Sequence, residues 1–225
     1  GCGLKECIQK AYESLNASRL EAPPPGKLRG RGIACMWKFS IGYAHVESGI
    51  KINEDGSAVL LTSAVEHGQG AHTILRQMAG EALGLNPDKI AVAHPDTSVS
   101  PYGWETSSSK PTFFDGNAIR QAAEDAKQQL FKIAALKLEA NAEDLEITDG
   151  RIFVKGSPER SVSFEDVAMG IPGPNGEFVG GPVYGRGHYT PVDVTGLDPE
   201  TGEGKQPGAF WMFAAQAAEV EVDEN

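Results

Sequence analysis

Two glycines near the middle of the chain have the spacing of a ligand-binding turn at the start of a helix. Gly68 and Gly70 flank Gln69, and apolar residues at helical spacing follow them. Glycine lets a backbone turn tightly and approach a ligand without a Cβ, and the free N–H groups of a helix start favour an anion. Gln69 adds a side-chain donor and acceptor. A glycine-rich turn that starts a helix and binds nothing is the alternative.

A second candidate segment, residues 96–112, is rich in Ser and Thr hydroxyls. It contains prolines and has no helical period, so we expect a long irregular loop over 95–112. Hydroxyls and backbone amides in such a loop suit a polyoxygenated ligand, such as a phosphate or a pterin, better than a metal ion. A solvated polar loop without a ligand is the alternative.

The histidines and cysteines do not form a metal-binding pattern. His67 and His72 flank the glycine turn, but no further ligands lie near them, so we expect no zinc site. Cys2, Cys7 and Cys35 are too few for a disulfide framework or for an iron–sulfur cluster. Reduced thiols are typical of cytoplasmic proteins, and we expect that location.

The charge balance argues against some classes of partner. The chain has 225 residues, with 20 Lys and Arg against 31 Asp and Glu, and a formal net charge of −11. Such a charge repels nucleic acids and anionic membranes, so we expect neither as a partner. It is compatible with a small anion that is held by local backbone N–H groups.

The elements that position the two segments can be predicted from periodicity. Apolar residues at helical spacing predict a helix over 4–20, and the proline-rich segment 22–26 predicts a linker. We therefore expect a helix and linker over 1–25 and the remaining domain over 26–225. The apolar, glycine-punctuated segment 32–46 predicts a buried strand.

Turn residues predict two hairpins and the ends of the helices. Asp55-Gly56 and Asp149-Gly150 each separate two apolar runs, as in β-hairpins. Gly84 is expected to end the helix that follows Gly70. A short strand is expected over 90–93, and Asp115 is expected to cap a long helix over 116–140.

The C-terminal part is predicted to be mostly loop. Residues 170–208 are rich in Gly and Pro, with one strand near 183–190. Phe210–Val222 is a strand for which we expect no partner within the chain, because both ends look like cuts in a longer protein. The predicted fold class is α+β, with mixed β-hairpins and a sheet packed with two longer helices.

Several short motifs follow one another in a fixed order along the chain. They are Asp55-Gly56-Ser57, Gly68-Gln69-Gly70-Ala71-His72-Thr73, Asp96-Thr97, Pro101-Tyr102-Gly103-Trp104, Thr106-Ser107-Ser108-Ser109 and Gly116-Asn117-Ala118. In order and spacing this series resembles the molybdopterin-binding large subunit of the xanthine dehydrogenase and aldehyde oxidase family of molybdenum hydroxylases. The resemblance extends more weakly over nearly the whole chain and implies half of a molybdopterin-binding domain, with 26–225 as the partial domain.

The resemblance also implies which residues contact the cofactor. The residues that would line the molybdopterin dithiolene and phosphate are His67, Gly68, Gln69 and Gly70. The residues that would hydrogen-bond the pterin or its phosphate tail are Thr106, Ser107, Ser108 and Ser109. Many relatives carry Ser where this chain has Pro111, which offers neither a hydroxyl nor an N–H group, so one anchoring bond is lost.

The implied cofactor is molybdopterin, with or without a cytosine dinucleotide tail. The family's base glutamate and the loops around its metal would lie outside this chain, so we expect no catalytic and no metal-ligating residue here. The implied partners are the remaining parts of the molybdenum subunit, together with domains or subunits that carry 2Fe–2S clusters and FAD.

The predicted function is therefore part of the cofactor cradle of a molybdenum oxidoreductase, inactive as an isolated fragment. Its small-molecule substrate would be a purine, an aldehyde, an N-heterocycle or an aromatic acyl-CoA. Two alternatives remain. One is a non-catalytic phosphate-binding module, and the other is a subunit-docking domain that uses the Phe210–Val222 edge.

Overall fold

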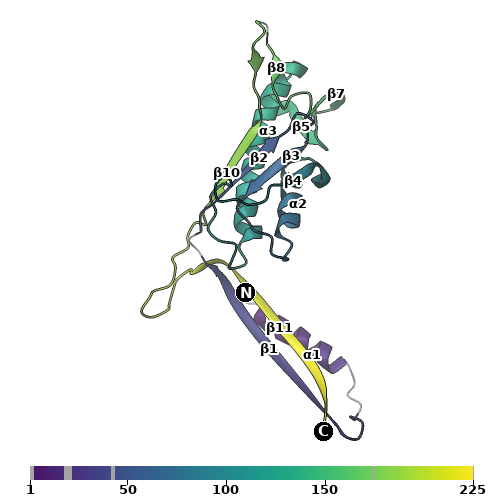
Figure 1. Cartoon of the computed structure of the whole chain (residues 1–225), viewed down its shortest axis with the longest axis vertical. Coiled ribbons are helices and arrows are strands. Elements are labelled where there is room, and N and C mark those ends of the chain that lie inside the picture. Colours follow the sequence, from purple (N-terminus) through teal and green to yellow (C-terminus); the bar gives the residue numbers. More distant parts are fainter. Residues whose placement is uncertain (1–2, 18–21, 42–43, 174, 225) are drawn as a thin grey trace. The chain divides into compact units, whose positions relative to one another are not determined.

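Helices and strands are mixed along the chain, which confirms the predicted α+β class (Figure 1). The computed structural model describes residues 3–17, 22–41, 44–173 and 175–224. Contacts divide the chain into unit 1, Gly1–Gly42 with Asp193–Asn225, and unit 2, Tyr43–Val192. The boundary that we expected after residue 25 lies inside unit 1.

A four-stranded sheet forms the centre of unit 2. Its strands, in spatial order, are β10 (Tyr184–Tyr189), β2 (Val46–Ile52), β3 (Ala58–Thr62) and β4 (Ile90–Val92). All neighbours are antiparallel except β3 and β4, which are parallel. The predicted hairpin between β2 and β3 is confirmed, and Gly56 has a φ of 75° at its turn.

Two helices bury one face of this sheet. α2 (Ala71–Leu83) and α3 (Pro111–Leu138) pack on it, and their apolar residues form the core. Fully buried members of this core include Ile50, Leu60, Leu75, Leu83, Ile119 and Leu130. Gly84 has a φ of 69° at the end of α2, which confirms the predicted helix end.

β10 lies unusually close to α3, which Figure 1 shows beside it. A Cβ on Gly187 would overlap the carbonyl oxygen of Ala118, and a Cβ on Gly185 would overlap that of Ala122. Glycine at both positions therefore permits the contact between strand and helix.

The predicted start of α3 was wrong. The helix begins at Pro111, not after Asp115, and Lys110 is its N-cap. Proline at the first helical position has a favourable φ and lacks only an N–H group that would have no intrahelical partner. Asp115 is buried within the helix and accepts a hydrogen bond from Thr62 Oγ1 at 3.1 Å.

Smaller sheets complete unit 2. β5 (Leu145–Thr148), β6 (Arg151–Val154) and β7 (Ser157–Ser163) form one of them. Asp149 and Gly150 between β5 and β6 have φ values of 48° and 73°, as in a type I′ turn, which confirms the second hairpin. β7 was not predicted because its sequence is mostly polar. β8 (Ile171–Pro172) and β9 (Phe178–Val179) pair within the segment that we expected to be loop.

The carboxylate of Asp166 ties the end of β7 to α3. It accepts hydrogen bonds from the N–H and hydroxyl groups of Ser163, both at 2.8 Å, and lies 3.0 Å from Lys137 Nζ. The hydrogen bonds from Ser163, together with Lys137, lower the pKa of Asp166 to about 2. This folded-state pKa lies below the unfolded value, so the stabilisation is present above about pH 4 and is lost as the pH falls towards 2.

Asp166→Asn should therefore destabilise the protein at pH 6 and have little effect near pH 2. Urea unfolding at both pH values measures this difference, with Glu146→Gln on the exposed side of β5 as the control. A destabilisation that is the same at both pH values would show that the charge of Asp166 contributes nothing.

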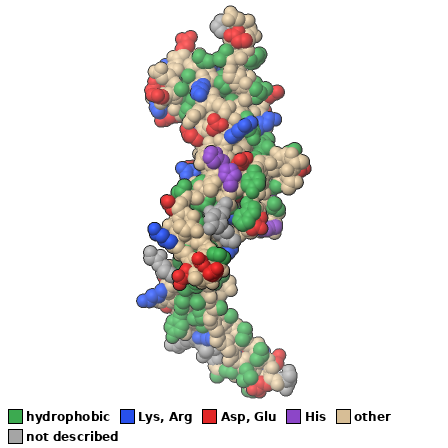
Figure 2. Space-filling view, turned by 90° about the vertical axis from the view of Figure 1, so that its left-hand side faces the viewer, with side chains coloured by type: hydrophobic (Ala, Val, Ile, Leu, Met, Phe, Trp, Pro, Cys, Tyr) green, Lys and Arg blue, Asp and Glu red, His purple; other side chains and the backbone are tan. Residues whose placement is uncertain are grey.

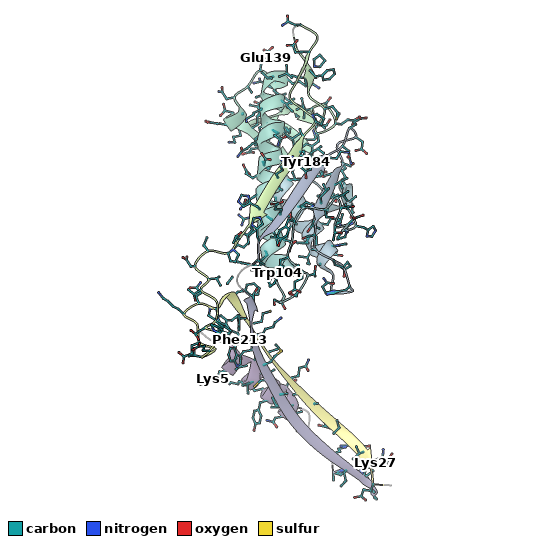
Figure 3. The ribbon with its side chains drawn as sticks, turned by 60° about the vertical axis from the view of Figure 1, so that its left-hand side comes forward. Lys5, Lys27, Trp104, Glu139, Tyr184 and Phe213 are labelled. Carbon is teal, nitrogen blue, oxygen red and sulfur yellow. The ribbon has the colours of Figure 1, made fainter. Side chains whose placement is uncertain are left out.

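Unit 1 contains a long two-stranded ribbon and one helix. β1 (Lys27–Ile41) pairs antiparallel with β11 (Gly208–Asp223), from Lys27 opposite Asp223 to Ile41 opposite Gly208. α1 (Leu4–Ala17) packs on the ribbon, and Figure 3 shows Lys5 of α1 near Phe213 of β11. Cross-strand ion pairs from Arg29 to Glu221 and from Arg31 to Glu219, both at 2.7 Å, support this register.

Two expectations for these segments need correction. β11 has a partner within the chain, since the N-terminal segment pairs with it. β1 ends at Ile41 and is not buried: the exposed fractions of Leu28, Met36 and Trp37 are 54%, 50% and 60%. Residues 18–20 of the predicted helix and 42–43 of the predicted strand lie outside the described residues.

The exposure of β1 follows from the architecture, because a two-stranded ribbon with one helix cannot bury both of its faces. Every buried hydrophobic side chain among the described residues belongs to unit 2. Figure 2 accordingly shows hydrophobic side chains on the surface in its lower part, where the ribbon lies. None of the helices in the described ranges is both long enough and apolar enough to span a membrane.

Candidate functional site

Both predicted segments lie in loops that meet at one end of unit 2. The first loop leads from β3 to α2, and the second leads from β4 to α3. Val65 N donates a hydrogen bond to Thr106 Oγ1 at 2.8 Å and so joins the two loops. In Figure 3, Trp104 of the second loop lies at the opposite end of unit 2 from Glu139, which ends α3.

The two glycines of the first loop face open space. Gly68 has a φ of 106° and Gly70, the N-cap of α2, a φ of 83°. No atom lies within 4 Å of the place where a Cβ would be built on either residue. Their backbone therefore requires glycine, and a ligand can approach it closely.

The side chain of Gln69 lies along its own turn. Its Oε1 accepts a hydrogen bond from His67 N at 2.9 Å, and its Nε2 donates one to Val65 O at 2.9 Å. His67 Nδ1 lies 3.1 Å from the same Oε1. Gln69 thus fixes the shape of the turn. The second N–H of its side-chain amide makes no hydrogen bond within this turn.

A carboxylate occupies the N–H groups at the start of α2. Glu66 accepts hydrogen bonds from the backbone N–H groups of Gly68, Gly70 and His72 at 2.8, 3.0 and 3.1 Å. These bonds, with that from Gly70 the largest contribution, lower the pKa of Glu66. Sequence reasoning assigned no role to Glu66, although a negatively charged side chain near the N-terminus of a helix is stabilising.

His72 behaves as a residue of the helix start. Its Nε2 lies 2.8 Å from the carbonyl oxygen of Ala64, which can only accept, so Nε2 carries the proton. Among the described residues, no group of three or more His, Cys, Asp or Glu side chains is arranged to hold a metal ion.

The second loop presents the predicted hydroxyl residues. Thr106 makes the contact to the first loop, and Ser107 Oγ donates to Glu105 Oε1 at 2.6 Å. Ser108 and Ser109 have φ values of 52° and 56°, in the left-handed region that residues other than glycine rarely adopt. Such strain is often stored at ligand-binding sites.

A buried lysine contacts both the backbone and the ring of a tryptophan in this loop. Lys110 is 1% exposed, and its Nζ donates to Trp104 O at 3.0 Å and lies 4.4 Å from the centre of the Trp104 ring. Burial lowers the pKa of Lys110 and raises that of Asp115. Neither role was predicted, because both residues make contacts that depend on the folded loop.

The two loops together are suited to binding a ligand. They present backbone amides, one side-chain amide and several hydroxyls around open space. A sequence model of the molybdopterin cofactor-binding domain matches residues 6–225. The chain belongs to this family.

Curated relatives of this molybdopterin cofactor-binding domain are much longer proteins. It is 33% identical over 173 residues to the gamma subunit of the 6-hydroxypseudooxynicotine dehydrogenase complex of Paenarthrobacter nicotinovorans, covering 73% of this chain and 21% of that protein. It is 30% identical over 177 residues to the xanthine dehydrogenase molybdenum-binding subunit of Escherichia coli O157:H7, covering 74% of this chain and 24% of that protein. The chain thus spans less than a quarter of the length of these relatives.

Solved structures share the fold. The CO dehydrogenase of Oligotropha carboxidovorans superimposes with a TM-score of 0.66 at 23% identity, over 97% of this chain and 26% of that one. The α+β arrangement is therefore also found within this CO dehydrogenase chain.

The residues of the two loops fit molybdopterin as a ligand. The open space at Gly68 and Gly70 accommodates close approach of a flat ring system. Amide and hydroxyl groups match the donors and acceptors of a pterin and the oxygens of a phosphate. When bound, the cofactor would supply the redox chemistry, and the residues of these loops would hold it in position.

Proposed function

We propose that this chain is part of the cofactor cradle of a molybdenum hydroxylase. The cradle consists of the first loop, with His67, Gly68, Gln69 and Gly70, and the second loop, with Thr106, Ser107, Ser108 and Ser109. The intact enzyme would be an oxidoreductase that acts on a purine, an aldehyde, an N-heterocycle or an aromatic acyl-CoA. This chain would contribute no catalytic residue and would be inactive alone.

The hydrogen bond from Val65 to Thr106 carries this proposal. It brings together two segments that lie about forty residues apart in the sequence. The motif series had shown only that one segment follows the other along the chain. Membership of the molybdopterin cofactor-binding family supplies the identity of the ligand. The printed names of the relatives support an oxidoreductase, although they describe those proteins and not this one.

Gln69→Ala is the test of this function in the intact molybdenum protein. The variant loses two hydrogen bonds within the turn, worth about 1 kcal/mol each, so molybdenum and pterin contents should fall about thirtyfold. Metal analysis and pterin fluorescence measure both. Gln128→Ala on the exposed side of α3 is the matched control and should retain both. A native protein without molybdenum would refute the cradle.

The proposal also names partners and location. The chain would bind the remaining parts of the molybdenum subunit and, with them, components that carry 2Fe–2S clusters and FAD. The exposed apolar side chains of the ribbon, among them Leu28, Met36 and Trp37, are typical of a surface that another protein covers. Its reduced cysteines are consistent with a cytoplasmic enzyme.

A further inference from the structure

We propose that Glu66 is a positioning residue that fills the anion position at the start of α2, so that the glycine turn receives the neutral ring system of the cofactor and not its phosphate. The inference rests on the proposed function, since it concerns the orientation of the same ligand in the same cradle. It differs from the expectation drawn from the glycine spacing, which placed an anion on these N–H groups.

The geometry of Glu66 carries the inference. One carboxylate oxygen accepts from Gly68 N and Gly70 N, and the other accepts from His72 N. Gly70 N and His72 N lie at the start of α2, where a phosphate would bind, and Gly68 N lies in the turn just before it. They already have an anionic acceptor from within the chain.

Charge repulsion makes double occupancy unfavourable. A phosphate placed beside the Glu66 carboxylate would be repelled by its like charge. Displacing Glu66 would break three charge-assisted hydrogen bonds, each stronger than a neutral one. One ring nitrogen of each neighbouring histidine is engaged elsewhere: Nδ1 of His67 with Gln69, and Nε2 of His72 with Ala64.

The groups that the turn still offers are neutral. Gly68 and Gly70 border open space, and the Gln69 amide keeps one N–H beyond its bond to Val65. Such groups suit the edge of an uncharged heterocycle, with its ring nitrogens and amide-like donors. The phosphate is then left to the hydroxyl loop, which contains Ser108 and Ser109.

Two readouts test the role of Glu66. In the intact protein, Glu66→Gln removes the charge that excludes a phosphate but keeps one acceptor oxygen for the turn, so we expect molybdenum and pterin contents to fall about tenfold because the cofactor is no longer held in one orientation. If the phosphate instead bound at the start of α2, removal of the competing carboxylate would raise retention. Increased or unchanged contents would therefore overturn the inference. Glu81→Gln, on the exposed face of α2, is the matched control.

The second readout needs no bound molybdenum. Inorganic pyrophosphate is titrated into the cofactor-free intact protein and into its Glu66→Ala variant. The variant should bind it at least about tenfold more tightly, because it exposes three N–H donors that Glu66 occupies in the native protein. Equal affinities would show that Glu66 does not fill an anion position. A native protein without molybdenum would remove the cofactor proposal, while this readout would still report on Glu66.

Discussion

Gly70→Val should abolish retention of the molybdenum cofactor by the intact protein. Gly70 has a φ of 83°, and a β-branched residue in this region costs at least about 1–2 kcal/mol. The new side chain would also extend into the open space that we assign to the ligand, because nothing lies within 4 Å of a Cβ at this position. Backbone strain and steric exclusion therefore act together, and we expect molybdenum and pterin near background.

Gly156→Val is the control that separates these two effects. Gly156 lies between β6 and β7, has a φ of 77°, and likewise has no atom within 4 Å of a Cβ. It should suffer a similar loss of thermal stability and keep its full molybdenum content. Equal molybdenum contents in the two valine variants would show that the turn at Gly70 does not line the cofactor site.

Gly187→Ala should destabilise the protein strongly although it adds only one methyl group. The added Cβ would overlap the carbonyl oxygen of Ala118 on α3, and neither a core strand nor a packed helix moves easily. We expect the free energy of unfolding to fall by about 3 kcal/mol or more, the upper range for overpacking.

Denaturant unfolding measures this loss, and Gly32→Ala is its control. Gly32 lies in β1, and no atom lies within 4 Å of a Cβ there, so the same chemical change should have little effect. A similar stability of the two variants would mean that β10 and α3 are not held at the close distance described above.

The features predicted correctly from the sequence depend on neighbouring residues. Asp149-Gly150 adopts the left-handed conformations that a two-residue hairpin turn requires, and Gly84 ends α2 in the same region. Each depends on the backbone preferences of one or two residues. The order of the motifs likewise indicated the family, because a motif series is a property of the sequence itself.

Features that depend on distant parts of the chain were missed. The partner of β11 is β1, whose residues lie almost two hundred positions earlier, and no periodicity in either strand indicates the other. The start of α3 was misplaced because Pro111 was taken as a loop residue.

The candidate site was likewise predicted in part: features that single residues carry were found, and features that depend on the folded loops were missed. Its glycines and hydroxyl residues were named from sequence, and their contacts with the cofactor stay a prediction. Glu66 and Lys110 were not given their roles, because each acts through backbone groups whose position only the folded loops define. A charged side chain that binds the main chain leaves no spacing pattern with other side chains.

The pairing of β1 with β11 makes unit 2 an insert within a ribbon. The chain leaves β1 at Ile41 and returns to its partner at Gly208, while within unit 2 the first residue of β2, Val46, pairs with the last residue of β10, Tyr189. The entry and exit of the insert are therefore neighbours, the geometry that permits one domain to be spliced into another. Modules that bear different cofactor loops can then be exchanged on one ribbon without changing how its two strands pair.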